Sequence, residues 1–271
     1  MVEFGGEFYL LENQDWDRFI NDDNLFWKTK ELIKSTSPSD SYGKLIETEL
    51  QAPIRSQEIW ASGVTYFNSK LARQEESKTS GGGDFYARVY VADRPELFFK
   101  STAQRAVGSG ENVRIRRDST WNVPEPELTL FITSSGRIAA YTIGNDMSSR
   151  SIEGENPLYL PQAKTYDHSA AIGPCLYIDE KPLKKETEIE MIINRAGAAV
   201  FSGKTDLGQI KRELDELVQW LFRELSFPAG CFLMTGTGII PPPEFTLADG
   251  DEIRITIEPI GTLVNLVSCE L

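Results

Sequence analysis

The side chains best suited to chemistry lie between Trp121 and Lys164. Glu125 and Glu127 are two residues apart in W-N-V-P-E-P-E, and Asp146 follows in G-N-D-M-S-S-R. On an extended strand, residues i and i+2 point to the same side, so the two glutamates are expected to share one face. Clustered carboxylates repel one another unless a cation lies between them. The spacing therefore predicts a divalent-cation site.

The type of ligand indicates which cation this would be. Carboxylate oxygens favour Mg²⁺, with Mn²⁺ or Ca²⁺ as substitutes, over zinc. His168 is the only histidine of the chain and lies far in sequence from both glutamates. Pro124 and Pro126 each lack a backbone N–H, which predicts an edge or a bulge where this strand begins. From local spacing alone, a solvated acidic strand end remains the alternative.

Lys164 stands in P-Q-A-K-T-Y-D-H-S, a run with few other charges. A lysine is ordinarily a solvated surface charge, and that interpretation stays open here. Partial burial and a nearby cation would lower its pKa, whereas carboxylates would oppose both effects. A lysine held near neutrality can act as a general base or acid. Lys164 is therefore a candidate catalytic residue.

Several further residues are candidates for the same site. Glu96, in R-P-E-L-F-F-K, precedes an apolar strand and either points into the cavity or forms a salt bridge with Arg94 or Lys100. Thr237, in T-G-T-G, could contact a ligand through its hydroxyl. An anionic substrate would need a cationic clamp in this acidic chain. The candidates for that clamp are Arg73, Lys100 and Arg150.

Short strands are expected to position these residues. Apolar runs between Gly- and Pro-containing turns predict strands at residues 113–116, 128–133, 138–144, 175–179, 188–194, 232–235 and 252–257. One helix is predicted from Leu207 to Leu221, where apolar residues recur at helical spacing. A second is predicted at residues 66–78, before a triple glycine (81–83) that is either a plain loop or the hinge of a lid.

The pattern predicts a β-rich α+β chain of two domains. Residues 1–60 are too few for a robust core of their own, so we expect a small N-terminal domain that leans on the rest. Residues 61–271 are expected to form the β-rich catalytic domain.

Composition narrows the range of partners and compartments. With 271 residues and 40% hydrophobic side chains, the chain can bury a core. Its net charge of −13 argues against binding nucleic acid or an anionic membrane surface. Its three cysteines are widely spaced and form no C-x-x-C pair, which favours buried thiols in a reducing cytoplasm. We expect no signal peptide and no membrane helix.

Taken in order, these motifs resemble the fumarylacetoacetate hydrolase superfamily from about Ala61 to the C-terminus. In that family, an E-x-E pair and the aspartate of an N-D-x-S-x-R turn bind Mg²⁺, which would assign that role to Glu125, Glu127 and Asp146. The family's lysine before a G-P turn matches Lys164, and its T-G-T motif matches residues 235–237. The segments G-V-T-Y, A-R-Q-E-E-S and I-E-G-E-N-P-L-Y-L-P-Q-A-K resemble the 2-keto-3-deoxy-D-arabinonate dehydratase group within it.

This resemblance implies a rolled, mixed β-sheet catalytic domain of the fumarylacetoacetate hydrolase type, a small N-terminal α/β domain and a homo-oligomer. It also implies elimination of water from a 2-keto-3-deoxy sugar acid to give a semialdehyde such as 2,5-dioxopentanoate. With that substrate, Lys164 is expected to remove the C3 proton and Glu96 to protonate the leaving hydroxyl, although the two roles could be exchanged.

One departure from the family favours dehydration over hydrolysis. Carbon–carbon hydrolases of the superfamily activate water with a histidine upstream of the metal ligands, and this chain has no histidine before His168. A glutamate could substitute for it. A metal-dependent hydrolase, decarboxylase or lyase of acylpyruvates or related β-diketo acids therefore stays as the alternative, followed by a non-catalytic member of the fold.

Overall fold

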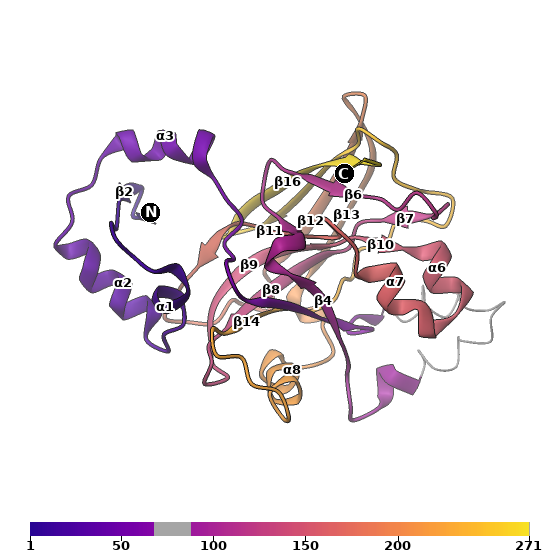
Figure 1. Ribbon diagram of the computed structural model, residues 1–271, viewed down its shortest axis with the longest axis horizontal. Helices are drawn as coiled ribbons and strands as arrows, with labels where there is room; N and C mark the ends of the chain where they lie inside the picture. The colour runs from indigo at the N-terminus through magenta and orange to yellow at the C-terminus, as the bar shows by residue number, and fades with distance from the viewer. Residues whose placement is uncertain (68–87, 271) are drawn as a thin grey trace.

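The computed structural model describes residues 1–67 and 88–270 (Figure 1). In that part of the chain, two large β-sheets form the body, and a small N-terminal segment lies to one side. The predicted helix at 66–78 falls almost wholly outside the described residues, as does the triple glycine at 81–83. The β-rich α+β class predicted from the sequence is confirmed, with strands dominating a curled, mixed sheet.

The larger sheet has seven strands and carries the candidate residues. Its pairs are antiparallel except for β3 with β14 and β11 with β5. In spatial order the strands are β4 (Glu96–Thr102), β3 (Glu58–Gly63), β14 (Cys231–Met234), β8 (Pro126–Ile132), β9 (Ile138–Asp146), β11 (Ala170–Tyr177) and β5 (Ala106–Val107).

A five-stranded sheet packs against one face of the larger sheet. Its strands, in spatial order, are β13 (Ala198–Asp206), β12 (Glu188–Arg195), β15 (Glu252–Ile257), β16 (Gly261–Ser268) and β6 (Asn112–Arg114). Leu128 and Ile143 of the larger sheet share one fully buried core with Met191 and Ile255 of the smaller one. Because side chains alternate along a strand, this packing leaves Glu127 on the opposite face of β8.

The N-terminal segment helps to cover that opposite face. It consists of β1 (Val2–Phe4), β2 (Glu7–Tyr9), α1 (Trp16–Ile20), α2 (Leu25–Lys34) and α3 (Asp40–Glu49). Ile20 and Leu25 are buried in a second core with Phe131 and Phe232 of the larger sheet. Strand β3 crosses the domain boundary expected at residue 60, and the division into two domains stays a prediction.

The single helix predicted from Leu207 to Leu221 is wrong over its first half. The chain forms a 3-10 turn, η3 (Leu207–Gln209), and only then α8 (Leu214–Leu221). Ile210 makes a β-bridge with Tyr66, and the Lys211 amide donates to the Thr65 carbonyl at 3.0 Å. These tertiary backbone bonds take the place of helical ones. Leu207 is still buried and Ile210 is partly buried, but neither belongs to an α-helix.

The edge expected where this strand begins is found locally, because the first residues of β8 pair with β9 alone although β8 lies between β14 and β9 in the sheet. Pro126 pairs with Asn145 of β9, whereas β14 pairs only with residues 129–132 of β8. The missing N–H of Pro126 therefore costs no ladder bond, since β14 has already ended beside it.

Short elements connect β9 to Lys164. Strand β10 (Ser148–Ser149) pairs with β7 (Asn122–Val123), and the chain continues through α6 (Arg150–Glu155), η2 (Pro157–Tyr159) and α7 (Leu160–Lys164). In Figure 1, α6 and α7 lie together at the end of the sheets opposite the N-terminal segment. Among the described residues, none of the helices is both long enough and apolar enough to span a membrane.

Candidate metal centre and active site

Glu125, Glu127 and Asp146 meet in one buried cluster. Each contributes a carboxylate oxygen, and these oxygens lie within 4.8 Å of one another. The pairing of β8 with β9 brings them together, since the Asp146 amide donates to the Glu125 carbonyl at 2.9 Å. All three residues are at most 4% exposed, which excludes the solvated strand end. Three close carboxylates suit a hard divalent cation such as Mg²⁺.

Each carboxylate of the cluster is held by a separate donor. Arg150 Nη2 contacts Glu125 Oε1 at 2.5 Å, and Lys100 Nζ contacts Asp146 Oδ1 at 2.6 Å. The Gly236 amide donates to Glu127 Oε2 at 2.6 Å. Such partners fix the orientation of a ligand before a metal binds.

Lys164 lies inside the cluster. Its ammonium donates to Glu125 Oε2, to Asp146 Oδ2 at 2.9 Å and to Ser148 Oγ at 2.5 Å, and the side chain is 1% exposed. It is the last residue of α7, which places it above the end of β9. The structure thus brings Lys164 together with two of the predicted metal ligands. A solvated surface lysine is excluded.

Burial shifts the pKa values of two groups in the cluster. The pKa of Glu127 is well above its usual range, because burial disfavours the charged form and because Asp146 and Glu125 add negative charge beside it. Burial lowers the pKa of Lys100 to about 8, against the opposing effect of Asp146. A bound divalent cation would favour the ionised form of Glu127.

Glu96 lies on β4 opposite Gly63 of β3. A Cβ atom added at Gly63 would lie 2.1 Å from Glu96 Oε2, so the carboxylate rests over this glycine. Phe98, two residues along the strand, has its ring 5.8 Å from Lys164 Nζ. Since residues i and i+2 share a face, Glu96 is on the same side of β4 as Lys164. Lys100, one of its expected salt-bridge partners, is bound to Asp146 instead.

The predicted substrate clamps have different surroundings. Lys100 is fully buried, forms an ion pair with Asp146 Oδ1 at 2.6 Å, and donates to the Met147 carbonyl at 3.0 Å and to the Lys164 carbonyl. The ammonium is thus enclosed by one carboxylate and two carbonyl groups of the protein, which argues against a role in binding a substrate carboxylate. Arg150 holds Glu125, and the Thr237 hydroxyl donates to the Ile239 carbonyl at 3.3 Å. Arg73 lies outside the described residues.

Two residues that contact the cluster were not predicted from the sequence. Ser148 is fully buried and accepts from Lys164, and its sequence signal is the serine of the N-D-x-S-x-R motif, to which no role was assigned. Gly236 lies in the T-G-T motif, and its amide contact with Glu127 depends on how β14 lies beside β8, which no local pattern reveals.

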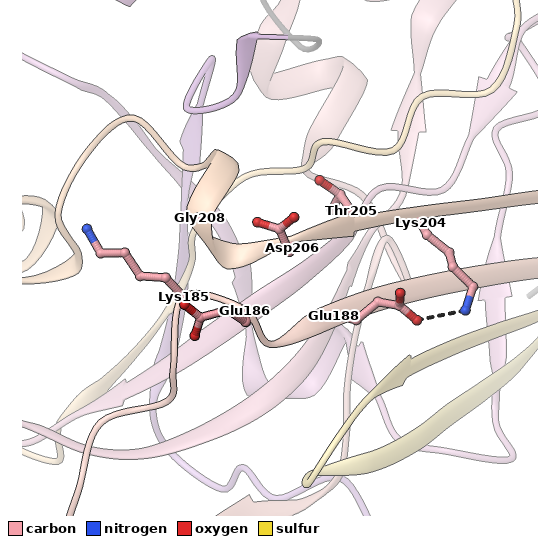
Figure 2. A pocket seen from close by; sticks show the side chains of 7 residues that line it. All are labelled: Lys185, Glu186, Glu188, Lys204, Thr205, Asp206 and Gly208. Atoms are coloured by element: carbon pink, nitrogen blue, oxygen red, sulfur yellow. Dashed lines mark hydrogen bonds and ion pairs between the residues drawn. The ribbon is translucent and has the colours of Figure 1, made fainter.

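A separate open pocket, with a volume of about 420 Å³, lies on the smaller sheet (Figure 2). Lys204 and Glu188, which form an ion pair at 2.7 Å, line it from neighbouring strands, together with Asp206 and Lys185. No residue of the carboxylate cluster lines this pocket. Both of its lysines are already in ion pairs, Lys204 with Glu188 and Lys185 with Glu213, so we do not assign the chemistry to it.

Comparison with known proteins places the chain among enzymes with this type of site. The model of the fumarylacetoacetate hydrolase C-terminal domain matches residues 59–268. A probable 2-keto-3-deoxyxylonate dehydratase of Haloferax volcanii is 46% identical over 224 residues, which are 82% of this chain and 76% of that protein. The chain therefore belongs to the fumarylacetoacetate hydrolase family, which confirms the resemblance found in the sequence.

Two further comparisons are with dehydratases of the same class of acid. The 2-dehydro-3-deoxy-D-arabinonate dehydratase of Saccharolobus solfataricus is 38% identical over 248 residues, covering 89% of this chain and 83% of that protein. A solved 2-keto-3-deoxy-D-arabinonate dehydratase, complexed with magnesium and 2,5-dioxopentanoate, superposes with a TM-score of 0.83 at 34% identity. The match covers 99% of this chain and 93% of the solved one.

Proposed function

We propose that this chain is a magnesium-dependent dehydratase that removes water from a 2-keto-3-deoxy sugar acid such as 2-keto-3-deoxy-D-arabinonate, giving 2,5-dioxopentanoate. The observation that carries the proposal is the buried Glu125–Glu127–Asp146 cluster with Lys164 inside it. Two relatives that are named as dehydratases of such acids support the proposal. A solved dehydratase structure that contains magnesium and 2,5-dioxopentanoate supports it further.

Glu125, Glu127 and Asp146 would hold the Mg²⁺ ion, and Mn²⁺ or Ca²⁺ could substitute for it. When bound, the cation polarises the keto group of the substrate and stabilises the negative charge that develops there. The protein contributes the fixed orientation of the ligands through Arg150 and the Gly236 amide.

Lys164 takes the proton from C3 of the substrate. The released electron pair forms the C3–C4 double bond as the C4 hydroxyl leaves, and Glu96 supplies the proton that converts this hydroxyl to water. Loss of a C5 proton and reprotonation at C3 then give the C4–C5 enol, and this enol becomes the C5 aldehyde when its hydroxyl proton is lost and C4 is protonated. Each positioned proton transfer contributes about 10²–10⁴-fold to the rate. The reverse assignment, with Glu96 as base and Lys164 as acid, uses the same two groups.

Recognition of the acid is assigned to the remaining predicted residues. Arg73 and Arg150 are proposed to bind the substrate carboxylate, and Thr237 to contact a substrate hydroxyl. Thr237 follows Gly236, whose amide contacts Glu127, so the loop that carries it is tied to the cluster. We do not propose Lys100 as a clamp, because its fully buried ammonium already pairs with Asp146 and donates to two backbone carbonyls.

The assembly and location of the enzyme are part of the same proposal. We propose a cytoplasmic homo-oligomer with a small-molecule 2-keto acid as its substrate. The free thiols of Cys175, Cys231 and Cys269 are consistent with a reducing compartment.

A panel of 2-oxo acids tests the proposed reaction. The magnesium-loaded protein is incubated with 2-keto-3-deoxypentonates, an acylpyruvate and oxaloacetate, and the products are identified by NMR. Oxaloacetate is included because an oxaloacetate tautomerase of Bacillus subtilis is 28% identical over 260 residues. We expect semialdehyde formation from a 2-keto-3-deoxypentonate. Release of pyruvate from the acylpyruvate, with no semialdehyde from any pentonate, would support the alternative reaction.

A further inference from the structure

Lys100 occupies a bulge beside the carboxylate cluster. In the pairing of β3 with β4, Ile59 faces Ser101 and Trp60 faces Phe99, which leaves Lys100 without an opposite residue. Bulges of this kind redirect a side chain and are frequent next to active sites. Here the side chain is fully buried and reaches two separate parts of the site.

One of its contacts is with a candidate metal ligand. Lys100 Nζ lies 2.6 Å from Asp146 Oδ1 and donates to the carbonyl of Met147, the next residue, at 3.0 Å. Asp146 Oδ2 is contacted by Lys164 at 2.9 Å. The carboxylate of Asp146 is thus held at both oxygens, each by a different ammonium.

The other contact is with the backbone that carries Lys164. Lys100 also donates to the Lys164 carbonyl, at the C-terminal end of α7, where a cation is favourably placed. The neighbouring Thr165 hydroxyl donates to the Phe99 carbonyl at 3.1 Å. Strand β4 is therefore hydrogen-bonded to Lys164, the last residue of α7, and to Thr165, which follows it.

We infer that Lys100 is a positioning residue that couples the metal ligand Asp146 to the catalytic Lys164, and that it does not bind substrate. The inference rests on the proposed function for the roles of Asp146 and Lys164. Its basis is the fully buried position of the ammonium, which joins an ion pair with Asp146 to hydrogen bonds with the carbonyls of Met147 and Lys164. Removing this ammonium would leave Asp146 Oδ1 without its ion pair and two carbonyls without this donor, which destabilises a buried site.

Metal affinity measured without substrate tests the inference. Lys100→Met is compared with Lys204→Met, a matched change at a half-exposed lysine that pairs with Glu188 on the smaller sheet. Mn²⁺ binding to each metal-stripped protein is followed by electron paramagnetic resonance. We expect about 10–100-fold weaker binding in Lys100→Met, as for other residues that orient metal ligands, and unchanged binding in Lys204→Met. Unchanged binding in a folded Lys100→Met protein would overturn the inference.

Kinetics separate this role from that of a clamp. At saturating Mn²⁺, Lys100→Met is expected to lower kcat and to leave the KM for the keto acid nearly unchanged, whereas loss of a clamp would chiefly raise KM. If the unmodified protein bound no Mn²⁺ at all, the proposed function itself would fail, and the inference with it.

A second measurement applies if Lys100→Met does not fold. In a crystal structure of the magnesium-loaded, unmodified protein with a 2-oxo acid bound, Lys100 Nζ is expected to remain on Asp146 and on the Lys164 carbonyl. A Lys100 side chain turned towards the carboxylate of the bound acid would overturn the inference.

Discussion

At the scale of single residues, the site depends on opposite charges that are buried together. Lys164 contacts two carboxylates and one hydroxyl, and all of these groups are almost fully removed from water. A buried ion pair is strongly destabilised when only one partner is removed. Burying these charges also carries a desolvation penalty, so the ion pairs need not stabilise the fold. We propose that their role is proton transfer beside a bound cation.

Replacing Lys164 by alanine should separate catalysis from metal binding. We expect turnover to fall by about 10²–10⁴-fold, because a positioned proton-transfer group is lost. Mn²⁺ binding should persist, since the cation can itself neutralise Glu125 and Asp146. Steady-state rates and electron paramagnetic resonance of bound Mn²⁺ measure the two effects.

Lys185→Ala is the control for that change, because Lys185 is 70% exposed and pairs with Glu213 on the surface. Lys185→Ala should change neither the turnover rate nor Mn²⁺ binding. A Lys164→Ala protein that turned over substrate at the normal rate would remove this lysine from the chemistry.

The residue types and spacing were enough to predict which carboxylates cluster with Lys164. They were not enough to assign Lys100, because its role depends on a β-bulge and on carbonyl groups 47 and 64 residues further along the chain. Ser148 was missed for a similar reason. Its hydroxyl is one of several near the cluster in sequence, and only the packing of α7 over β10 selects it.

At the scale of elements, the turn after β14 shows how backbone geometry supports the site. Gly236 has a φ of +91°, and a Cβ atom there would lie 2.0 Å from Thr65 Oγ1 and 3.0 Å from the Ser62 carbonyl. Its amide donates to Glu127. A residue other than glycine would have to move the turn, and with it the donor that orients this carboxylate.

Gly236→Ala should therefore affect both stability and metal binding. We expect a loss of about 1–3 kcal/mol in the free energy of unfolding, from the strained backbone and the clash. Mn²⁺ affinity should also fall. Urea unfolding of the metal-stripped protein and Mn²⁺ titration measure these changes.

Gly250→Ala provides the comparison, because Gly250 also has a positive φ, of +81°, but has open space around it. Gly250→Ala should lower the free energy of unfolding only through the strained backbone, without a clash, and should leave the Mn²⁺ affinity unchanged. Equal losses of stability in the two variants, with metal affinity unchanged in both, would contradict the role assigned to the turn.

A strand or helix was predicted correctly where its apolar pattern faces the core and its backbone bonds are not replaced by tertiary ones. The strand at 252–257 is found at its predicted bounds, since its alternating apolar residues face one core. Strand β13 was missed because most of its side chains are at least partly exposed and give no apolar pattern. The helix pattern at 207–213 failed because tertiary bonds to Thr65 and Tyr66 replaced helical ones.

At the scale of the whole molecule, the balance of charge in the cluster links metal binding to pH. Glu127 has a raised pKa in the folded protein, so it retains a proton that the unfolded chain releases. Its contribution to stability is therefore full below its unfolded pKa and is lost as pH rises through its folded pKa. The metal-free protein should lose stability over this range.

Magnesium should reverse that loss, because the cation needs Glu127 in its ionised form. We expect Mg²⁺ affinity to rise with pH through the folded pKa of Glu127, with release of a proton on binding. Calorimetric titration in two buffers of different ionisation enthalpy measures both. An affinity independent of pH, with no proton released, would contradict the assignment of Glu127 as a ligand.

The most direct test of the central claim is semialdehyde formation from 2-keto-3-deoxy-D-arabinonate by the same protein before and after metal removal. We predict that the magnesium-loaded protein forms 2,5-dioxopentanoate, that treatment with EDTA abolishes the reaction, and that added Mg²⁺ restores it. Undiminished formation of 2,5-dioxopentanoate by the EDTA-treated protein would contradict a metal-dependent dehydratase.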